Sequence, residues 1–158
     1  MLSRLFPLGV KITFEDRPYR LGETVNISVE LEPRREQEVR EGRIDLVCEE
    51  RWTEVHTVRV QVNRPRIGSA TGVPEPTITV PKRVTESHRE TFVHSSVIFL
   101  KDGRLQPGRA SRHSATLLIL PNPPPHADQA AVSWRLVTTV DVVGARDIKA
   151  RRLVKVTA

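Results

Sequence analysis

The amino-acid sequence predicts an all-β fold, a sandwich of two antiparallel sheets built from seven to nine strands. Apolar and polar residues alternate along most of the chain, and short stretches of turn-forming residues interrupt the alternation. Twelve prolines oppose helix formation, and no window shows a helical period of apolar residues. Short, closely spaced strands without crossover helices favour an antiparallel sandwich.

The clearest predicted strand runs from Thr24 to Glu32, with a period of two that has no exception. Similar patterns predict strands over 10–14, 43–49, 57–62, 132–142 and 148–156, and less regular ones over 91–100 and 116–120. The alternation places ten side chains between the two sheets: Val25, Ile27, Val29, Leu31, Ile44, Leu46, Val60, Trp134, Leu136 and Val140.

Turn-forming residues mark the expected ends of the strands, among them Leu21-Gly22, Gly42, Asp102-Gly103 and Gly144. The longest predicted loop covers 63–76 and carries Arg64 and Arg66. Long loops on a rigid scaffold often carry function, so these two arginines are candidate partner-binding residues.

The length of 158 residues predicts one domain, spanning 1–158, that is large enough to bury its own hydrophobic core. A single cysteine rules out an intramolecular disulfide and fits a reducing compartment. The first residues show no signal-peptide pattern, and no apolar run is long enough for a membrane helix. We therefore expect a cytoplasmic protein.

The net charge of +6 arises from 25 basic and 19 acidic residues that are interleaved along the chain. This mixture, with only seven aromatic residues, argues against nucleic acid as a partner. The most basic local stretch places Lys149, Arg151 and Lys155 on the polar face of the last strand. A solvated outer face is the simpler interpretation. Contact with an acidic protein partner or, less favoured, with a membrane surface is the functional one.

No catalytic or metal-binding set is visible in the sequence. Cys48 shares an apolar face with Ile44 and Leu46, which predicts a buried structural thiol. The five histidines show no ligand spacing on a common element, so we expect surface or loop histidines. Glu49 and Glu50 are neighbours on a strand and point to opposite faces. We therefore predict no enzyme activity, no cofactor and no bound metal.

The two tryptophans are expected to lie in or over the core. Trp134 is placed centrally in a long alternating strand, where many sandwiches bury a tryptophan. Trp52 follows a strand beside charged neighbours, which favours a position covering the core over a role as a binding anchor.

Three stretches in a fixed order resemble the arrestin-like superfamily, which includes bacterial proteins related to sporulation control. The first, 19–25, reads Tyr-Arg-Leu-Gly-Glu-Thr-Val and resembles the family's Tyr-x-Pro-Gly-Glu-x-Val turn, with Leu21 in place of proline. The second is the apolar strand that ends at Pro121 before a proline cluster. The third is 133–136, Ser-Trp-Arg-Leu, with Trp134 where the family usually has tyrosine.

The resemblance implies an immunoglobulin-like, arrestin-like β-sandwich that acts as a non-catalytic adaptor or scaffold for another protein. The chain has length for one sandwich, whereas full arrestins have two, so functions that need a cleft between domains are not implied. The alternative is a secreted or surface immunoglobulin-like structural module. The sequence leaves the identity of the partner and the oligomeric state open.

Overall fold

The computed structural model describes residues 7–63 and 77–158, and its described residues form strands and turns without a helix. Among them there is accordingly no helix long and apolar enough to cross a membrane. The nine strands are β1 Leu8–Phe14, β2 Tyr19–Arg20, β3 Thr24–Pro33, β4 Gln37–Asn63, β5 Thr77–Leu105, β6 Ser111–Leu118, β7 Ala131–Val142, β8 Ile148–Val154 and β9 Val156–Thr157. The predicted all-β fold class is confirmed.

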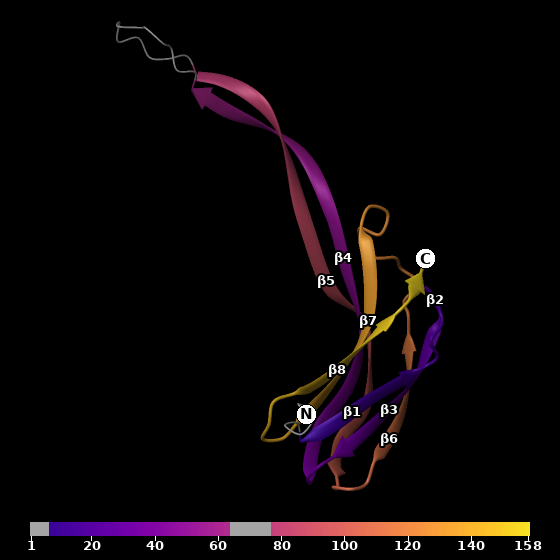
Figure 1. Ribbon diagram of the computed structural model, residues 1–158. Helices are drawn as coiled ribbons and strands as arrows, with labels where there is room; N and C mark the ends of the chain where they lie inside the picture. The colour runs from indigo at the N-terminus through magenta and orange to yellow at the C-terminus, as the bar shows by residue number, and fades with distance from the viewer. Residues whose placement is uncertain (1–6, 64–76) are drawn as a thin grey trace, which may run out of the picture.

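Two antiparallel sheets form the body of the molecule (Figure 1). One has the strand order β1-β3-β6, and the other has the order β5-β4-β7-β8. A short parallel pair, β2 and β9, lies where the C-terminus meets the turn before β3. The two sheets pack face to face, as in other sandwiches, and enclose one hydrophobic core.

The core confirms the predicted alternation for nine of the ten inward residues. In β3, the four side chains Val25, Ile27, Val29 and Leu31 are at most 2% exposed, and residues between them face outward. Ile44, Leu46, Trp134, Leu136 and Val140 belong to the same buried cluster. The two-residue period of a strand therefore determined which face turned inward.

The prediction for Val60 is wrong. This side chain is 37% exposed, because β4 continues far beyond the sandwich and, within residues 7–63 and 77–158, pairs there with β5 alone. Beyond the pair Arg51–Ala131, β7 no longer accompanies β4. We call the projecting two-stranded part, residues 52–63 with 77–88, the arm (Figure 1).

The predicted break at Gly42 is a bulge inside β4 rather than the end of a strand. The register of β4 against β5 shifts between Gly42 and Arg43. A Cβ atom on Gly42 would lie 2.5 Å from Cζ of Phe99, so a glycine is needed where this ring crosses the backbone. The strands predicted over 43–49 and 57–62 are thus two parts of one long strand.

The turn that carries the family-like motif is held by its own side chains. Gly22 has φ of +89°, a conformation that glycine adopts without strain. The Glu23 carboxylate accepts a hydrogen bond from the Arg20 backbone N–H at 2.9 Å, and the Tyr19 hydroxyl donates to the Glu15 carbonyl at 2.7 Å. The tyrosine and the glycine-glutamate pair therefore have structural roles.

Candidate functional site

Three of the five predicted cationic residues lie at the edge of the four-stranded sheet. Lys149 and Arg151 are exposed on one face of β8, and Lys155 is exposed between β8 and β9. None of the three forms an ion pair with another described residue. Arg64 and Arg66, the other two candidates, lie outside the described residues. We call Lys149, Arg151 and Lys155 the basic stripe.

Cys48 is fully buried in the core, as the sequence predicted. Burial raises the pKa of its thiol to about 12, and the nearby Glu50 carboxylate acts in the same direction. A thiol with so high a pKa holds almost no thiolate at neutral pH, and the thiolate is the nucleophilic form. Cys48 is therefore a packing residue.

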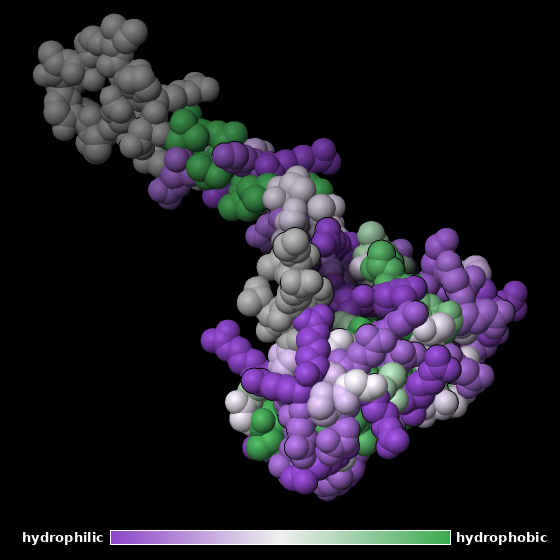
Figure 2. Space-filling view, turned by 60° about the horizontal axis from the view of Figure 1, so that its bottom comes forward, coloured by the Kyte–Doolittle hydropathy of each residue, from purple (hydrophilic) through white to green (hydrophobic). Residues whose placement is uncertain are grey.

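Most apolar residues of the arm lie on one of its faces, whereas Val55 is exposed on the other. Directly opposite residues of an antiparallel pair share a face, and Val60 pairs with Val80 while Val62 pairs with Ile78. We call this surface the valine face: Val58, Val60, Val62, Ile78, Val80 and Val84. Val58, Val60, Val62 and Val80 are 37–44% exposed, and Figure 2 shows apolar groups along the arm. This face continues the inner face of the sheet out of the sandwich.

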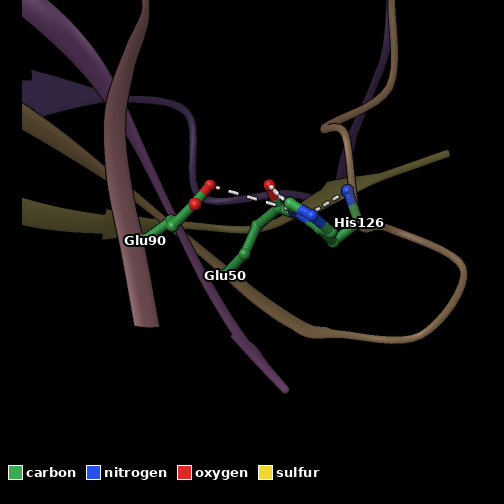
Figure 3. A group of neighbouring side chains, drawn as sticks. All are labelled: Glu50, Glu90 and His126. Atoms are coloured by element: carbon green, nitrogen blue, oxygen red, sulfur yellow. Dashed lines mark hydrogen bonds and ion pairs between the residues drawn. The ribbon is translucent and has the colours of Figure 1, made fainter. Parts of the chain in front are cut away.

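Polar and ionisable side chains occupy the same face nearer the body. Glu50 of β4 and Glu90 of β5 are directly opposite each other, at the root of the arm. His126, from the segment between β6 and β7, reaches over them (Figure 3). Its backbone N–H donates to Oε2 of Glu50 at 2.7 Å, and its Nδ1 lies 3.6 Å from Oε1 of the same carboxylate.

Trp52 connects this root to the next group along the arm. Its indole stacks on His126, with ring centroids 4.0 Å apart, and on His88, with centroids 5.2 Å apart. The indole N–H donates to Oε1 of Glu54 at 3.3 Å. Trp52 is 9% exposed, so the expected burial is confirmed. The expected position over the core is not, because Trp52 lies outside the core cluster and is covered by the two histidines.

A second group of histidines and carboxylates lies beyond Trp52. Glu54 and Glu86 are directly opposite each other, and their carboxylates lie 3.3 Å from Nε2 of His56. Nε2 of His88 lies 3.3 Å from Glu54 and 3.6 Å from Glu86. The Trp52 hydrogen bond, followed by the histidine charges, lowers the pKa of Glu54. We call these four residues the arm cluster.

Glu49 confirms that adjacent strand residues point to opposite faces. Its carboxylate lies on the other side of β4, 2.6 Å from both Arg51 and Arg89 and 3.4 Å from Arg135. Hydrogen bonds from Arg51 and Arg89 lower the pKa of Glu49. This ion cluster ties β4, β5 and β7 together at the level where the arm leaves the sheet.

Sequence reasoning missed both groups of histidines and carboxylates. One signal was available: Glu-x-His occurs at 54–56 and again at 86–88. Alternate residues of a strand share a face, so each copy presents both side chains together. The antiparallel register that brings the two copies opposite each other, and the approach of His126, were not visible in any local pattern.

Comparison with known proteins identifies the fold. No family model matches the chain, and no curated protein matches it. The crystal structure of Spo0M, a sporulation control protein from Bacillus subtilis, is similar with a TM-score of 0.66 and 18% sequence identity. The match covers 97% of this chain and 50% of that one, so this chain spans half the length of that protein. The chain therefore has the arrestin-like β-sandwich fold that its three motifs predicted.

Proposed function

We propose that this chain is a non-catalytic protein-interaction domain, an adaptor or scaffold, that binds an extended segment of a partner protein along its arm. The observation that carries the proposal is the open edge of β4. This strand pairs with β7 as far as Arg51–Ala131 and then continues to Asn63, where β5 is its only paired neighbour among the described residues. We call the position beside β4 residues 52–63, in line with β7, the open lane.

An unpaired strand edge presents N–H and C=O groups that an extended peptide can pair with. The two edges of the arm differ in this respect. Pro81 lies within β5 and has no N–H to donate, which blunts the β5 edge. Residues 52–63 of β4 contain neither proline nor glycine. A strand in the open lane would also continue an existing sheet, because β7 already lies beside β4 as far as Arg51.

The position of Pro81 indicates which β4 amides face the open lane. Pro81 is opposite Arg59, and a proline is excluded from pairs that exchange both hydrogen bonds. We infer that Arg59 directs its N–H away from β5, and that Thr57 and Gln61 do the same, since N–H directions alternate along a strand. The valine face would lie beside alternate side chains of the incoming strand, which predicts an alternating apolar-polar partner segment.

The stability of the arm supports the same conclusion. A two-stranded ribbon is marginally stable in water by itself, and exposed contiguous apolar surface marks interaction sites. A third strand would place its own apolar side chains beside the valine face and complete the backbone hydrogen bonding of β4. Fold alone does not assign function, so the proposal depends on this site rather than on the likeness to Spo0M.

A phage-displayed library of random twelve-residue peptides tests the proposal. We expect the wild-type chain to select peptides with alternating apolar residues. Thr57→Pro removes one N–H from the open lane and should weaken binding of a selected peptide at least tenfold. Thr57→Ala, which keeps the N–H, should bind like wild type.

Three outcomes would overturn the proposal. The library yields no peptide that binds above background, or selected peptides bind Thr57→Pro as tightly as wild type. The third is a wild-type dimer in analytical ultracentrifugation that Thr57→Pro dissociates, since a second copy of the chain would then fill the lane. Circular dichroism checks that both variants remain folded.

A further inference from the structure

The root of the arm contains two buried polar atoms without a hydrogen-bond partner. The Glu50 side chain is fully buried, and its Oε1 has no partner among the described residues. The same holds for Nδ1 of His126, which faces that oxygen at 3.6 Å (Figure 3). A buried carboxylate oxygen without a partner is costly, so such an atom calls for an explanation.

Glu90 adds a third possible ligand atom to this oxygen and nitrogen. It lies directly across from Glu50 on β5, and its Oε2 lies 3.9 Å from Nδ1 of His126. One donor atom from each of the three residues falls within 4.8 Å of the other two. Two ligands of a tetrahedral zinc ion are about 3.3 Å apart, because zinc binds histidine nitrogen and carboxylate oxygen at about 2.0–2.2 Å. Glu90 is 58% exposed and can move to close the remaining gap.

We propose that Glu50, Glu90 and His126 bind a divalent transition-metal ion, and that zinc fits the set of donors. Imidazole nitrogen with carboxylate oxygen suits zinc better than magnesium or calcium, which prefer oxygen alone. Three protein ligands leave a fourth position for water on the exposed side of Glu90. The ion would give both unpartnered atoms a ligand bond.

Neighbouring contacts hold the ligands in place, as they do around known metal sites. The backbone N–H of His126 fixes Oε2 of Glu50, which leaves Oε1 turned to the imidazole. The ring of His126 stacks on Trp52 and cannot rotate freely. A surface hollow of about 480 Å³, lined in part by Trp52, His88 and Gln129, lies beside the stack.

The arm cluster is the competing location for an ion. Glu54, His56 and Glu86 also form a group of possible ligands, but all three are exposed, and Nε2 of His56 already lies 3.3 Å from a carboxylate oxygen of each glutamate. A simple ion pair between Glu50 and a protonated His126 is the competing explanation for the root. The experiment therefore has to separate three possibilities.

The metal would join three segments that are far apart in the sequence. Glu50 lies on β4, Glu90 on β5, and His126 in the segment before β7. Trp52, at the start of the open lane, stacks on His126. The ion would clasp the arm to the body at that point, whether or not a partner strand occupies the lane.

Zinc chloride added to chelator-treated protein provides the test, read by isothermal titration calorimetry and by thermal unfolding. We expect wild type to bind one ion and to unfold at a higher temperature with zinc. Glu50→Gln, Glu90→Gln and His126→Asn should each weaken binding at least tenfold and lose most of the thermal shift. His94→Asn, a histidine outside both groups, should behave like wild type.

If the variant Glu50→Gln fails to fold because Glu50 is buried, the variant Glu90→Gln at an exposed position still tests the proposal. The proposal is wrong if wild type shows no zinc binding at 1 mM, which would leave the ion pair. It is equally wrong if Glu90→Gln and His126→Asn both retain wild-type affinity. Loss of binding in His56→Asn, with binding retained in His126→Asn, would place the ion in the arm cluster instead.

Discussion

The imidazole of His126 stacks on the indole of Trp52 with a centroid separation of 4.0 Å and an interplanar angle of 15°. This contact joins the segment before β7 to the root of the arm, where β4 loses its β7 neighbour. The open lane and the proposed metal ligands therefore meet at one place in the fold.

Thr138 should be replaceable by valine with a gain in stability. Its side chain is fully buried, and its hydroxyl has no hydrogen-bond partner among the described residues. Thr138→Val keeps the shape and removes the desolvated hydroxyl, so the free energy of unfolding should rise by about 1 kcal/mol. Urea denaturation measures the change, with the half-buried Thr139→Val as control. A destabilised Thr138→Val would show that the hydroxyl has an unseen partner.

Gly42→Ala should destabilise the protein. The added Cβ would lie 2.5 Å from Cζ of Phe99, which requires the ring or the backbone to move, at a cost of about 1–3 kcal/mol. Gly9→Ala is the matched control, because its Cβ would meet its nearest atom at an ordinary 3.5 Å. A double-mutant cycle with Phe99→Leu should recover part of the loss. Equal effects at Gly42 and Gly9 would contradict the steric argument.

Glu49 should stabilise the protein at neutral pH and lose that contribution in acid. Hydrogen bonds from Arg51 and Arg89 lower its pKa in the folded state, so the unfolded state binds a proton first as pH falls. Its contribution is therefore present above about pH 4.3, the ordinary glutamate value, and is lost as pH falls through the lowered pKa. Glu49→Gln should be less stable than wild type at pH 7, with a difference that shrinks towards pH 3.

Urea midpoints measured at several pH values between 3 and 7 test this dependence. Glu32→Gln is the control, since Glu32 is exposed and its carboxylate forms no ion pair with a described residue. A constant difference between Glu49→Gln and wild type over this range would show that the arginine contacts do not lower the pKa.

Charge reversal in the basic stripe should slow association with a library-selected peptide that also carries acidic residues, without changing its dissociation. Exposed charges act over about 8–10 Å at physiological salt and mainly affect the rate of encounter. We expect the triple reversal of Lys149, Arg151 and Lys155 to lower the association rate in surface plasmon resonance. Reversal of Arg109, an exposed turn residue, is the control. A hundredfold faster dissociation in the triple variant would make the stripe the binding site.

The core was predictable because alternation is a local property. The inward orientation of Val25 to Leu31 could be predicted without knowing any other strand, since one face of a strand repeats every second residue. The same rule correctly placed Glu49 and Glu50 on opposite faces. It failed at Val60, where the pattern of a half-buried strand continues although no second sheet covers the apolar face.

The sequence by itself determined the all-β class, the inward face of most strands and the arrestin-like order of the motifs. Only the tertiary structure decided that 43–49 and 57–62 belong to one strand, and that His126 meets Glu50 and Glu90. The physical reason is that periodicity reports which side chains share a face, whereas burial depends on what another segment brings against that face. That pairing is set by register and packing between distant residues, which no local pattern records.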